Sequence, residues 1–212
     1  MFLALTRVVG QETGRTAQPM VVLPAPVERG SVSLEEALRR RRSVREYTTQ
    51  ALTDVQLSQL LWAAQGITDP AGYRTAPSAG ALYPLEVYVA TGAGLHRYEA
   101  RDHRLIRVAE GDSRPALRRA ALGQEAVGAA AAVFIITAVP SRTAAKYGAQ
   151  RGMRYVQLEA GHAAQNLLLE AAALGLGAVP VGAFEDDHVG GILHLQAGEV
   201  PLYLIPVGQP LR

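Results

Sequence analysis

Cysteine is absent from this chain of 212 residues. Its absence excludes disulfide bonds, thiolate nucleophiles, iron–sulfur clusters and zinc sites built from thiolates. No stretch reaches the roughly 18 uninterrupted apolar residues that a membrane-spanning helix requires. The apolar start, Met1 to Leu5, is followed by Arg7 and Gln11 before the core of a signal peptide could form. We therefore expect a cytoplasmic protein.

A large excess of one charge is also lacking. Lysine and arginine number 21 and aspartate and glutamate 19, so the formal net charge is only +2. The four consecutive arginines, Arg39 to Arg42, have no interleaved aromatic residues, so a nucleic-acid footprint is not supported. With 49% hydrophobic and 19% charged residues, the chain has the composition of a globular protein, and its length suits one domain.

The chain divides near residue 33. Residues 1–32 mix glycine, proline and polar positions without a sustained period, which predicts an extended N-terminal arm. Residues 33–212 are predicted to form a single folded domain. Ser33 to Glu36 is a capping box, a pattern that starts a helix, and it predicts a helix over about 34–41.

Another capping box, Thr53 to Gln56, precedes apolar residues at helical spacing. This pattern predicts a second helix, and Gly66 is placed to end it. Trp62 lies on this helix and is expected to be a core residue, with a position near a ligand as the alternative.

Extended segments occupy the middle and the end of the chain. Residues 132–138 form a continuous apolar run with β-branched members, as expected of a central strand that is covered on both faces. The order of strands and helices predicts an α+β fold, a mixed sheet flanked by helices. Strands are predicted over residues 85–90, 95–98, 105–108, 132–138, 178–183 and 201–207, and short helices over 113–122 and 187–193.

The longest predicted helix covers residues 153–174 and has one broad apolar face. Gly161, Ala163 and Ala164 keep it thin, so another helix or a second copy of the chain could approach its backbone closely. His162 and Glu159 on this helix invite a metal or acid–base interpretation. The other histidines share no ligand spacing with them, and a core or interface histidine is the simpler interpretation.

Arg41, Ser43 and Arg45 alternate where the first helix gives way to extended chain. Guanidinium groups match the geometry of phosphate and the hydroxyl adds a donor, so a phosphate monoester suits this position. The alternative is a solvated charge run that ends a helix and gains from its dipole. Pro77 to Pro84 combines small residues with rigid prolines, and it is either a loop shaped for a ligand or an ordinary turn.

Four motifs together resemble the nitroreductase superfamily of FMN enzymes, and most of all its SagB-type dehydrogenase branch. They are RRSVREY at 41–47, TAPSAGALYPLEVY at 75–88, GHAAQN at 161–166 and PVGAFEDD at 180–187. The resemblance covers about residues 33–208. It implies a three-layer α+β sandwich with a mostly antiparallel sheet, which dimerises and binds FMN at the subunit interface without a metal.

Carried over by position, the resemblance assigns a flavin contact to four segments. It places the phosphate on Arg41, Arg42 and Ser43, and Arg45 near the ribityl and pyrimidine side, where a cation favours the reduced flavin. The isoalloxazine would be cradled by Pro77, Ser78, Ala79, Gly80 and Ala81, and flavin N5 would be met by the backbone of Val181, Gly182 and Ala183. Many nitroreductases have asparagine at the position of Ala81, and many end in a basic segment for which only Arg212 could substitute here.

Lys146 and Tyr147 resemble a pair that azoline-oxidising members use. A lysine beside an apolar flavin loses hydration, which favours the neutral amine that can act as a base. The first expected function is oxidation of a peptide azoline to an azole. The alternatives are a nitroreductase or quinone reductase with NAD(P)H as transient co-substrate, and a flavin-binding scaffold without catalysis; for the Lys–Tyr pair alone, an ordinary surface pair is also open.

Overall fold

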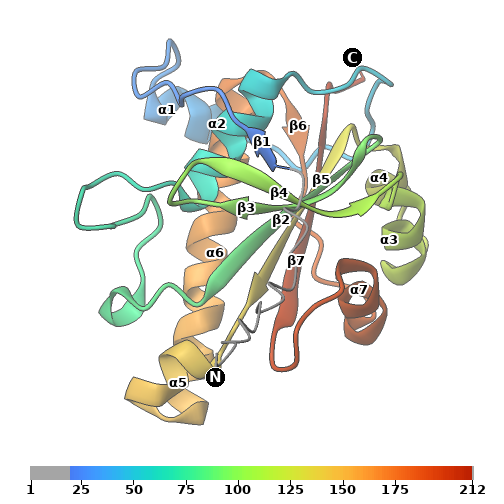
Figure 1. The fold of residues 1–212 in the computed structure, drawn as a ribbon. Coiled ribbons are helices and arrows are strands. Elements are labelled where there is room, and N and C mark those ends of the chain that lie inside the picture. The colour runs from blue at the N-terminus through green and yellow to red at the C-terminus, as the bar shows by residue number, and fades with distance from the viewer. Residues whose placement is uncertain (1–19, 212) are drawn as a thin grey trace, which may run out of the picture.

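The computed structural model describes residues 20–211, which form a seven-stranded antiparallel sheet with helices on both faces (Figure 1). The predicted α+β fold is confirmed. No helix in this described part is long and apolar enough to cross a membrane. The strands are β1 (Met20–Val22), β2 (Leu85–Thr91), β3 (Gly94–Glu99), β4 (Arg104–Glu110), β5 (Ala132–Ala138), β6 (Gly177–Ala178) and β7 (Val200–Gly208). The helices are α1 (Leu34–Arg40), α2 (Asp54–Gln65), α3 (Arg114–Ala120), α4 (Glu125–Ala129), α5 (Ser141–Tyr147), α6 (Ala149–Ala173), α7 (Asp186–Leu193) and the 3-10 turn η1 (Ala79–Ala81).

The centre of the sheet is the pairing of β5 with β2 and β7, in the order β1-β4-β3-β2-β5-β7-β6. All residues of β5 are buried, as the apolar run predicted. Successive side chains of a strand point to opposite faces. Phe134 therefore packs into a core with α2 and α6, and Ile135 into a second core with α3, α4 and α7. The helices on each face are visible in Figure 1.

Both predicted helix starts are confirmed, but only Thr53 and Gln56 form the complete, reciprocal capping box. The Ser33 hydroxyl accepts the N–H of Glu36 at 3.2 Å, and Thr53 and Gln56 exchange side-chain to backbone bonds of 3.2 and 2.9 Å. Gly66 ends α2 as predicted, in an extended conformation. A Cβ at Gly66 would lie 2.2 Å from the Trp62 ring, so the glycine is required for space.

Helices α5 and α6 pack closely because α6 carries a glycine at their contact. A Cβ on Gly152 would lie 2.9 Å from backbone atoms of Ala144 in α5. The sequence predicted α6 four residues too late and missed α5, which lacks a side-chain cap. A Cβ on Gly161, in contrast, would meet nothing within 4 Å in the described chain.

The predicted strand over 178–183 is wrong in length. Only Gly177–Ala178 forms β6, and Val181 adds an isolated bridge to Leu204 of β7. Pro180 lies between them and has no N–H to donate to a ladder, which explains the interruption.

Part of the predicted arm is integrated in the sheet. Met20–Val22 pairs with β4 as an edge strand, and Gln59 of α2 bonds both the N–H and the carbonyl of Val27, at 2.8 and 3.0 Å. The boundary at residue 33 between arm and domain stays a prediction. The apolar start at Met1 to Leu5 and Arg212 lie outside the described residues.

Candidate functional site

The cationic turn, residues 41–45, is fixed to the edge of the sheet through its backbone. Ser43 forms a parallel bridge with Ala178 of β6, and Val44 donates its N–H to the Ala178 carbonyl at 3.0 Å. The main chain is thus held while the side chains of Ser43 and Arg45 are exposed.

Tyr47 pins the end of this turn. Its hydroxyl lies 2.5 Å from the carbonyl oxygen of Val44 and 3.2 Å from that of Pro206. Its buried ring occupies the space beside two glycines, so that a Cβ on Gly177 would approach it to 3.4 Å and one on Gly208 to 2.9 Å. The turn is therefore held in one position, between β6 and β7.

A cavity of about 260 Å³ opens beside the cationic turn. None of its described lining residues is acidic. Within residues 20–211, Arg41 and Arg45 take part in no ion pair, whereas Arg39 and Arg40 pair with Glu36 at 3.3 and 2.5 Å. The cavity is lined by Arg40, Arg41, Arg42, Val44, Leu168, Ala172, Gly175, Leu176, Ala178 and Pro210.

The loop of residues 77–83, called the flavin loop below for its predicted role, has an unusual backbone. Gly80, Ala81 and Tyr83 have φ of 66°, 52° and 45°, in the left-handed region. Such a conformation costs a non-glycine residue on the order of 1 kcal/mol, and it persists where the surroundings enforce it. Inside the loop, the Ser78 hydroxyl accepts the N–H of Tyr83 at 2.9 Å.

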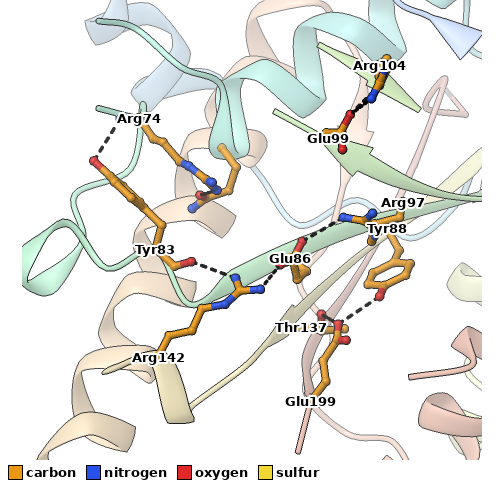
Figure 2. A network of polar contacts seen from close by, with 11 residues as sticks. Arg74, Tyr83, Glu86, Tyr88, Arg97, Glu99, Arg104, Thr137, Arg142 and Glu199 are labelled. Atoms are coloured by element: carbon orange, nitrogen blue, oxygen red, sulfur yellow. Dashed lines mark hydrogen bonds and ion pairs between the residues drawn. The ribbon is translucent and has the colours of Figure 1, made fainter. Parts of the chain in front are cut away.

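Neighbouring elements hold both ends of the flavin loop. Before it, Asn166 of α6 donates to the Thr75 carbonyl at 3.2 Å. At its other end the Tyr83 hydroxyl accepts the backbone N–H of Arg74 at 3.2 Å, and the Tyr83 carbonyl accepts from the Arg142 guanidinium at 3.2 Å (Figure 2). Arg142 also pairs with Glu86 of β2 at 2.6 Å. The loop is therefore clamped between α6, α5 and the sheet.

The structure brings Lys146 and Tyr147 to the flavin loop. A Cβ on Gly80 would lie 2.8 Å from the Tyr147 hydroxyl and 3.0 Å from Lys146 Nζ. Tyr147 also packs edge-on against Tyr155 of α6, with ring centroids 5.0 Å apart. Lys146 is exposed, so the desolvation that the base hypothesis requires would have to come from a bound ligand or a second chain.

Residues 181–183 come after β6, the strand to which the cationic turn is bridged. Val181 is buried through its bridge to β7, whereas Gly182 and Ala183 are exposed. Gln124 donates to the Ala183 carbonyl at 2.9 Å, and a Cβ on Gly182 would meet nothing within 4 Å. The backbone of Gly182 is therefore open to a ligand.

These predicted site residues form two groups within one chain. The cationic turn lies beside the C-terminal part of α6, at Ala172, and it is bridged to β6, the strand that leads to residues 181–183. The flavin loop lies with Lys146 and Tyr147 beside its N-terminal half, at Glu159. Thirteen residues of helix separate these contacts, roughly 20 Å. One chain does not unite the groups, which fits the predicted interface between two copies.

Glu159 of α6 is the feature that the sequence analysis did not assign. Its side chain is only 2% exposed and its Oε1 has no hydrogen-bond partner within the described chain. Burial raises the pKa of Glu159 to about 7, against the lowering effects of a hydrogen bond with Ser78 and of the charge on Arg74. The signal in the sequence was its place in line with the apolar Val156 and Ala163, at helical spacings of three and four. His162 beside it is exposed.

A larger cavity of about 730 Å³ lies between the sheet and α7. Both carboxylates in its lining have partners: Glu86 pairs with Arg97 at 3.5 Å, and Glu199 accepts from Thr137 at 2.5 Å and Tyr88 at 3.1 Å (Figure 2); Arg107 pairs with Glu110 at 3.0 Å, although its Nε has no partner in the described chain. It therefore offers a ligand less free charge than the cationic turn does. Trp62 lines a separate groove between α1, α2 and α6.

The residues present fit FMN. At the cationic turn, Arg41 and Arg42, which form no ion pair in the described chain, line a cavity whose described lining has no carboxylate, and the hydroxyl residue Ser43 is exposed in the same turn; guanidinium and hydroxyl donors are what a phosphate requires. After β6, Gly182 presents uncovered backbone, because a Cβ there would meet nothing within 4 Å in the described chain.

Comparisons with known proteins point to one family. A model of the nitroreductase family matches residues 38–209. A nitroreductase-like protein of Methanocaldococcus jannaschii is 45% identical over 187 residues, which cover 85% of this chain and 93% of that protein. The crystal structure of a nitroreductase-like protein from Ralstonia eutropha has a TM-score of 0.83 at 31% identity, covering 100% of this chain and 97% of the other.

Two more distant structures share the fold. The microcin synthetase complex of E. coli, with a truncated pro-microcin bound, matches with a TM-score of 0.73 at 22% identity, over 100% of this chain and 85% of that one. The NADPH:FMN oxidoreductase of Vibrio harveyi in complex with NAD+ matches with a TM-score of 0.63 at 22% identity, over 84% and 69%.

Proposed function

The chain belongs to the nitroreductase family, and from this we propose that it is an oxidoreductase with FMN as its prosthetic group. When bound, FMN supplies two-electron chemistry through hydride exchange at N5. The cationic turn is the observation that carries the proposal, because its backbone is fixed while Arg41 and Arg45 have no ion-pair partner in the described chain.

The chain's own residues divide the work of binding. Arg41, Arg42 and Ser43 hold the phosphate, and Arg45 places a positive charge near the pyrimidine side. The flavin loop of a second copy of the chain borders the ring, opposite Val181 to Ala183. A homodimer is part of the proposal, because the two groups of residues lie apart in one chain.

A comparison of FMN with riboflavin tests the phosphate assignment. Arg41→Ala should weaken FMN binding about 10- to 100-fold, because a hydrogen bond to a charged group contributes about 1.5–3 kcal/mol. It should leave riboflavin binding unchanged, since riboflavin has no phosphate. Flavin fluorescence titration measures both, and Arg119→Ala, an exposed arginine on α3, serves as control. Equal losses for both flavins, or a wild-type protein that binds no FMN, would refute the assignment.

The finer proposal is a SagB-type dehydrogenase that oxidises peptide azolines to azoles. The contact of Lys146 and Tyr147 with Gly80 of the flavin loop supports it, and so does the fold shared with the microcin synthetase complex. The Lys146 amine would accept the carbon-bound proton of the azoline, and the Tyr147 hydroxyl would orient the amine or relay the proton.

The second candidate is an NAD(P)H-dependent nitroreductase or quinone reductase, which the exposure of Lys146 favours because that reaction needs no carbon base. The variant Lys146→Ala separates the two. Loss of thiazoline-peptide oxidation in this variant supports the dehydrogenase; NADPH oxidation with a nitroaromatic acceptor at the wild-type rate supports the reductase. A flavin-loaded protein inert to every donor would point instead to a scaffold.

A further inference from the structure

Glu159 occupies a position where a charged side chain is costly. It lies on the packed face of α6, in line with Val156 and Ala163, and is 2% exposed. Its Oε1 has no hydrogen-bond partner within residues 20–211, and no ion pair in that range includes it. A carboxyl that is buried with an oxygen lacking a hydrogen bond lowers the stability of the fold, so its presence calls for another explanation.

The nearest cation does not neutralise this carboxyl. Arg74 donates to Gln65 Oε1 at 2.8 Å and stacks 4.8 Å above the centre of the Tyr83 ring. Its charge acts on Glu159 only from a distance. Gln65 Nε2 is also buried without a partner in the described chain, so the cluster under the flavin loop is incompletely bonded.

Ser78 links the carboxyl to the flavin loop. Its oxygen accepts the N–H of Tyr83 at 2.9 Å, which leaves its own proton to stabilise the carboxylate of Glu159. The loop runs along this part of α6, since Asn166 bonds Thr75 before it and Tyr147, which abuts Gly80, packs on Tyr155. Two residues after Ser78, Gly80 abuts Lys146 and Tyr147. The chain of contacts from Glu159 through Ser78 therefore ends at the predicted catalytic pair.

We propose that Glu159 is a positioning residue: its ionised carboxylate holds the Ser78 hydroxyl and fixes the flavin loop against Lys146 and Tyr147, and protonation of the carboxyl loosens the loop. Only the last step, from loop to flavin, rests on the proposed function. The hydrogen bond from Ser78 stabilises the ionised form, so by linkage the ionised form stabilises the bond.

Glu159 changes its charge near neutral pH, because burial raises its pKa to about 7. The charged and titratable groups around it are few: Arg74 from the loop connection, Lys146 and Tyr147 from α5 beyond Gly80, and His162 on the exposed side of α6. Glu86 and Arg142 act on Arg74 from β2 and α5. Substitutions can therefore separate Glu159 from its surroundings.

Lys146 provides the reporter, because it is the only lysine in the sequence. Reductive methylation with ¹³C-formaldehyde labels this amine, whose methyl resonance differs from that of the α-amine. In the flavin-free full-length protein, the Lys146 resonance should shift in a step near pH 7. Glu159→Gln should abolish the step, and Ser78→Ala should move it upward by roughly one pH unit.

Two matched controls lie on the same helix. Glu170→Gln removes another carboxyl whose pKa burial raises, next to Gln59, and His162→Gln removes the neighbouring imidazole. Both variants should keep the step near pH 7. A step that survives in Glu159→Gln, or disappears in His162→Gln, would overturn the proposal, and so would a wild-type resonance without a step.

Flavin binding is measured separately, so that the two proposals can fail independently. The FMN dissociation constant of wild type should be several-fold smaller at pH 8 than at pH 6, and that of Glu159→Gln should not change with pH. A clear Lys146 step without any pH effect on FMN affinity would support the role of Glu159 and refute the assignment of this loop to flavin.

Discussion

The two halves of α6 serve two regions that hold their functional residues in opposite ways. Beside its C-terminal half, the cationic turn has a backbone tied to β6, while Ser43 and Arg45 are exposed. Beside its N-terminal half, the flavin loop is bonded at both ends and backed by the buried Glu159. The first region supplies charge on adaptable side chains, and the second supplies shape.

This difference matches the two parts of a flavin nucleotide. A phosphate is recognised mainly by charge, which tolerates small movements of long side chains. A planar ring needs surfaces that are in place before it binds, because ordering them afterwards reduces affinity. Substitutions should therefore affect the stability of the protein strongly beside the N-terminal half of α6 and weakly at the cationic turn.

The largest expected effect comes from the buried carboxyl. The pKa of Glu159 is raised from 4.5 to about 7, so the folded state binds this proton more tightly than the unfolded state does. Its contribution to the free energy of unfolding is therefore complete below pH 4.5 and is lost as the pH rises through 7. Glutamine cannot ionise. Between pH 4.5 and pH 8 the free energy of unfolding of Glu159→Gln should therefore gain about 3 kcal/mol relative to wild type.

Urea denaturation at a series of pH values measures this difference. Subtracting the two proteins removes the contributions of His96 and His103, whose pKa values are lowered by burial and which act in the opposite direction. A difference that does not vary with pH would mean that Glu159 is not strained in its ionised form.

Glycine substitutions in α6 give the next largest effect. Gly152→Ala should lower the free energy of unfolding by about 2 kcal/mol, because the new methyl would press on the backbone of α5 at 2.9 Å. Gly161→Ala on the same helix should raise it by about 0.5–1 kcal/mol, since the position is open and alanine favours helix. If Gly161→Ala destabilised the protein instead, a second copy of the chain would be covering this position.

A smaller effect is expected in the flavin loop itself. Gly80→Ala should lower the free energy of unfolding by about 1 kcal/mol, because φ of 66° is unfavourable for alanine. The neighbouring Lys146 and Tyr147 tips can move aside, which keeps the loss small. Gly182→Ala, with nothing within 4 Å of its new methyl, is the control and should change stability little. Thermal or urea unfolding compares the two variants.

The smallest effect is expected at the cationic turn. The double variant Arg41→Ala with Arg42→Ala should change the free energy of unfolding by less than about 0.5 kcal/mol, because neither side chain forms an ion pair in the described chain. A loss of 2 kcal/mol or more would show that these arginines support the fold and would remove the contrast between the two regions.

The sequence predicted the elements whose signals are local. Ser33 and Thr53 mark helix starts because their hydroxyls bond amides three residues ahead, and the apolar run 132–138 coincides with β5. Helix α5 carried no such signal, since Pro140 at its start provides no side-chain cap. The strand expected over 178–183 is shorter than predicted. Pro180 has no N–H to donate, so it separates Gly177–Ala178 from the bridge at Val181.

The site residues likewise differ in how far the sequence predicts them. The cationic turn was visible in the sequence as a run of charge. The contact of Gly80 with Lys146 joins residues 66 positions apart, which a single sequence does not reveal. Glu159 was considered only together with His162, as a metal or acid–base pair, and it was assigned no role because the other histidines share no ligand spacing with them. Glu159 is buried and His162 is exposed, a difference that a spacing of three along a helix does not reveal.

Tyr47 has a consequence for how this family changes over evolutionary time. Its side chain fills the volume that a side chain at Gly208 would need, so enlarging Gly208 first requires a smaller residue 47, whereas at Gly177 the obstacle is Val44. Shrinking residue 47 alone leaves a void at the sheet edge. Descendant sequences are therefore expected to retain or replace Tyr47 and Gly208 together, and lineages that keep this pair keep the backbone position of the arginines with it.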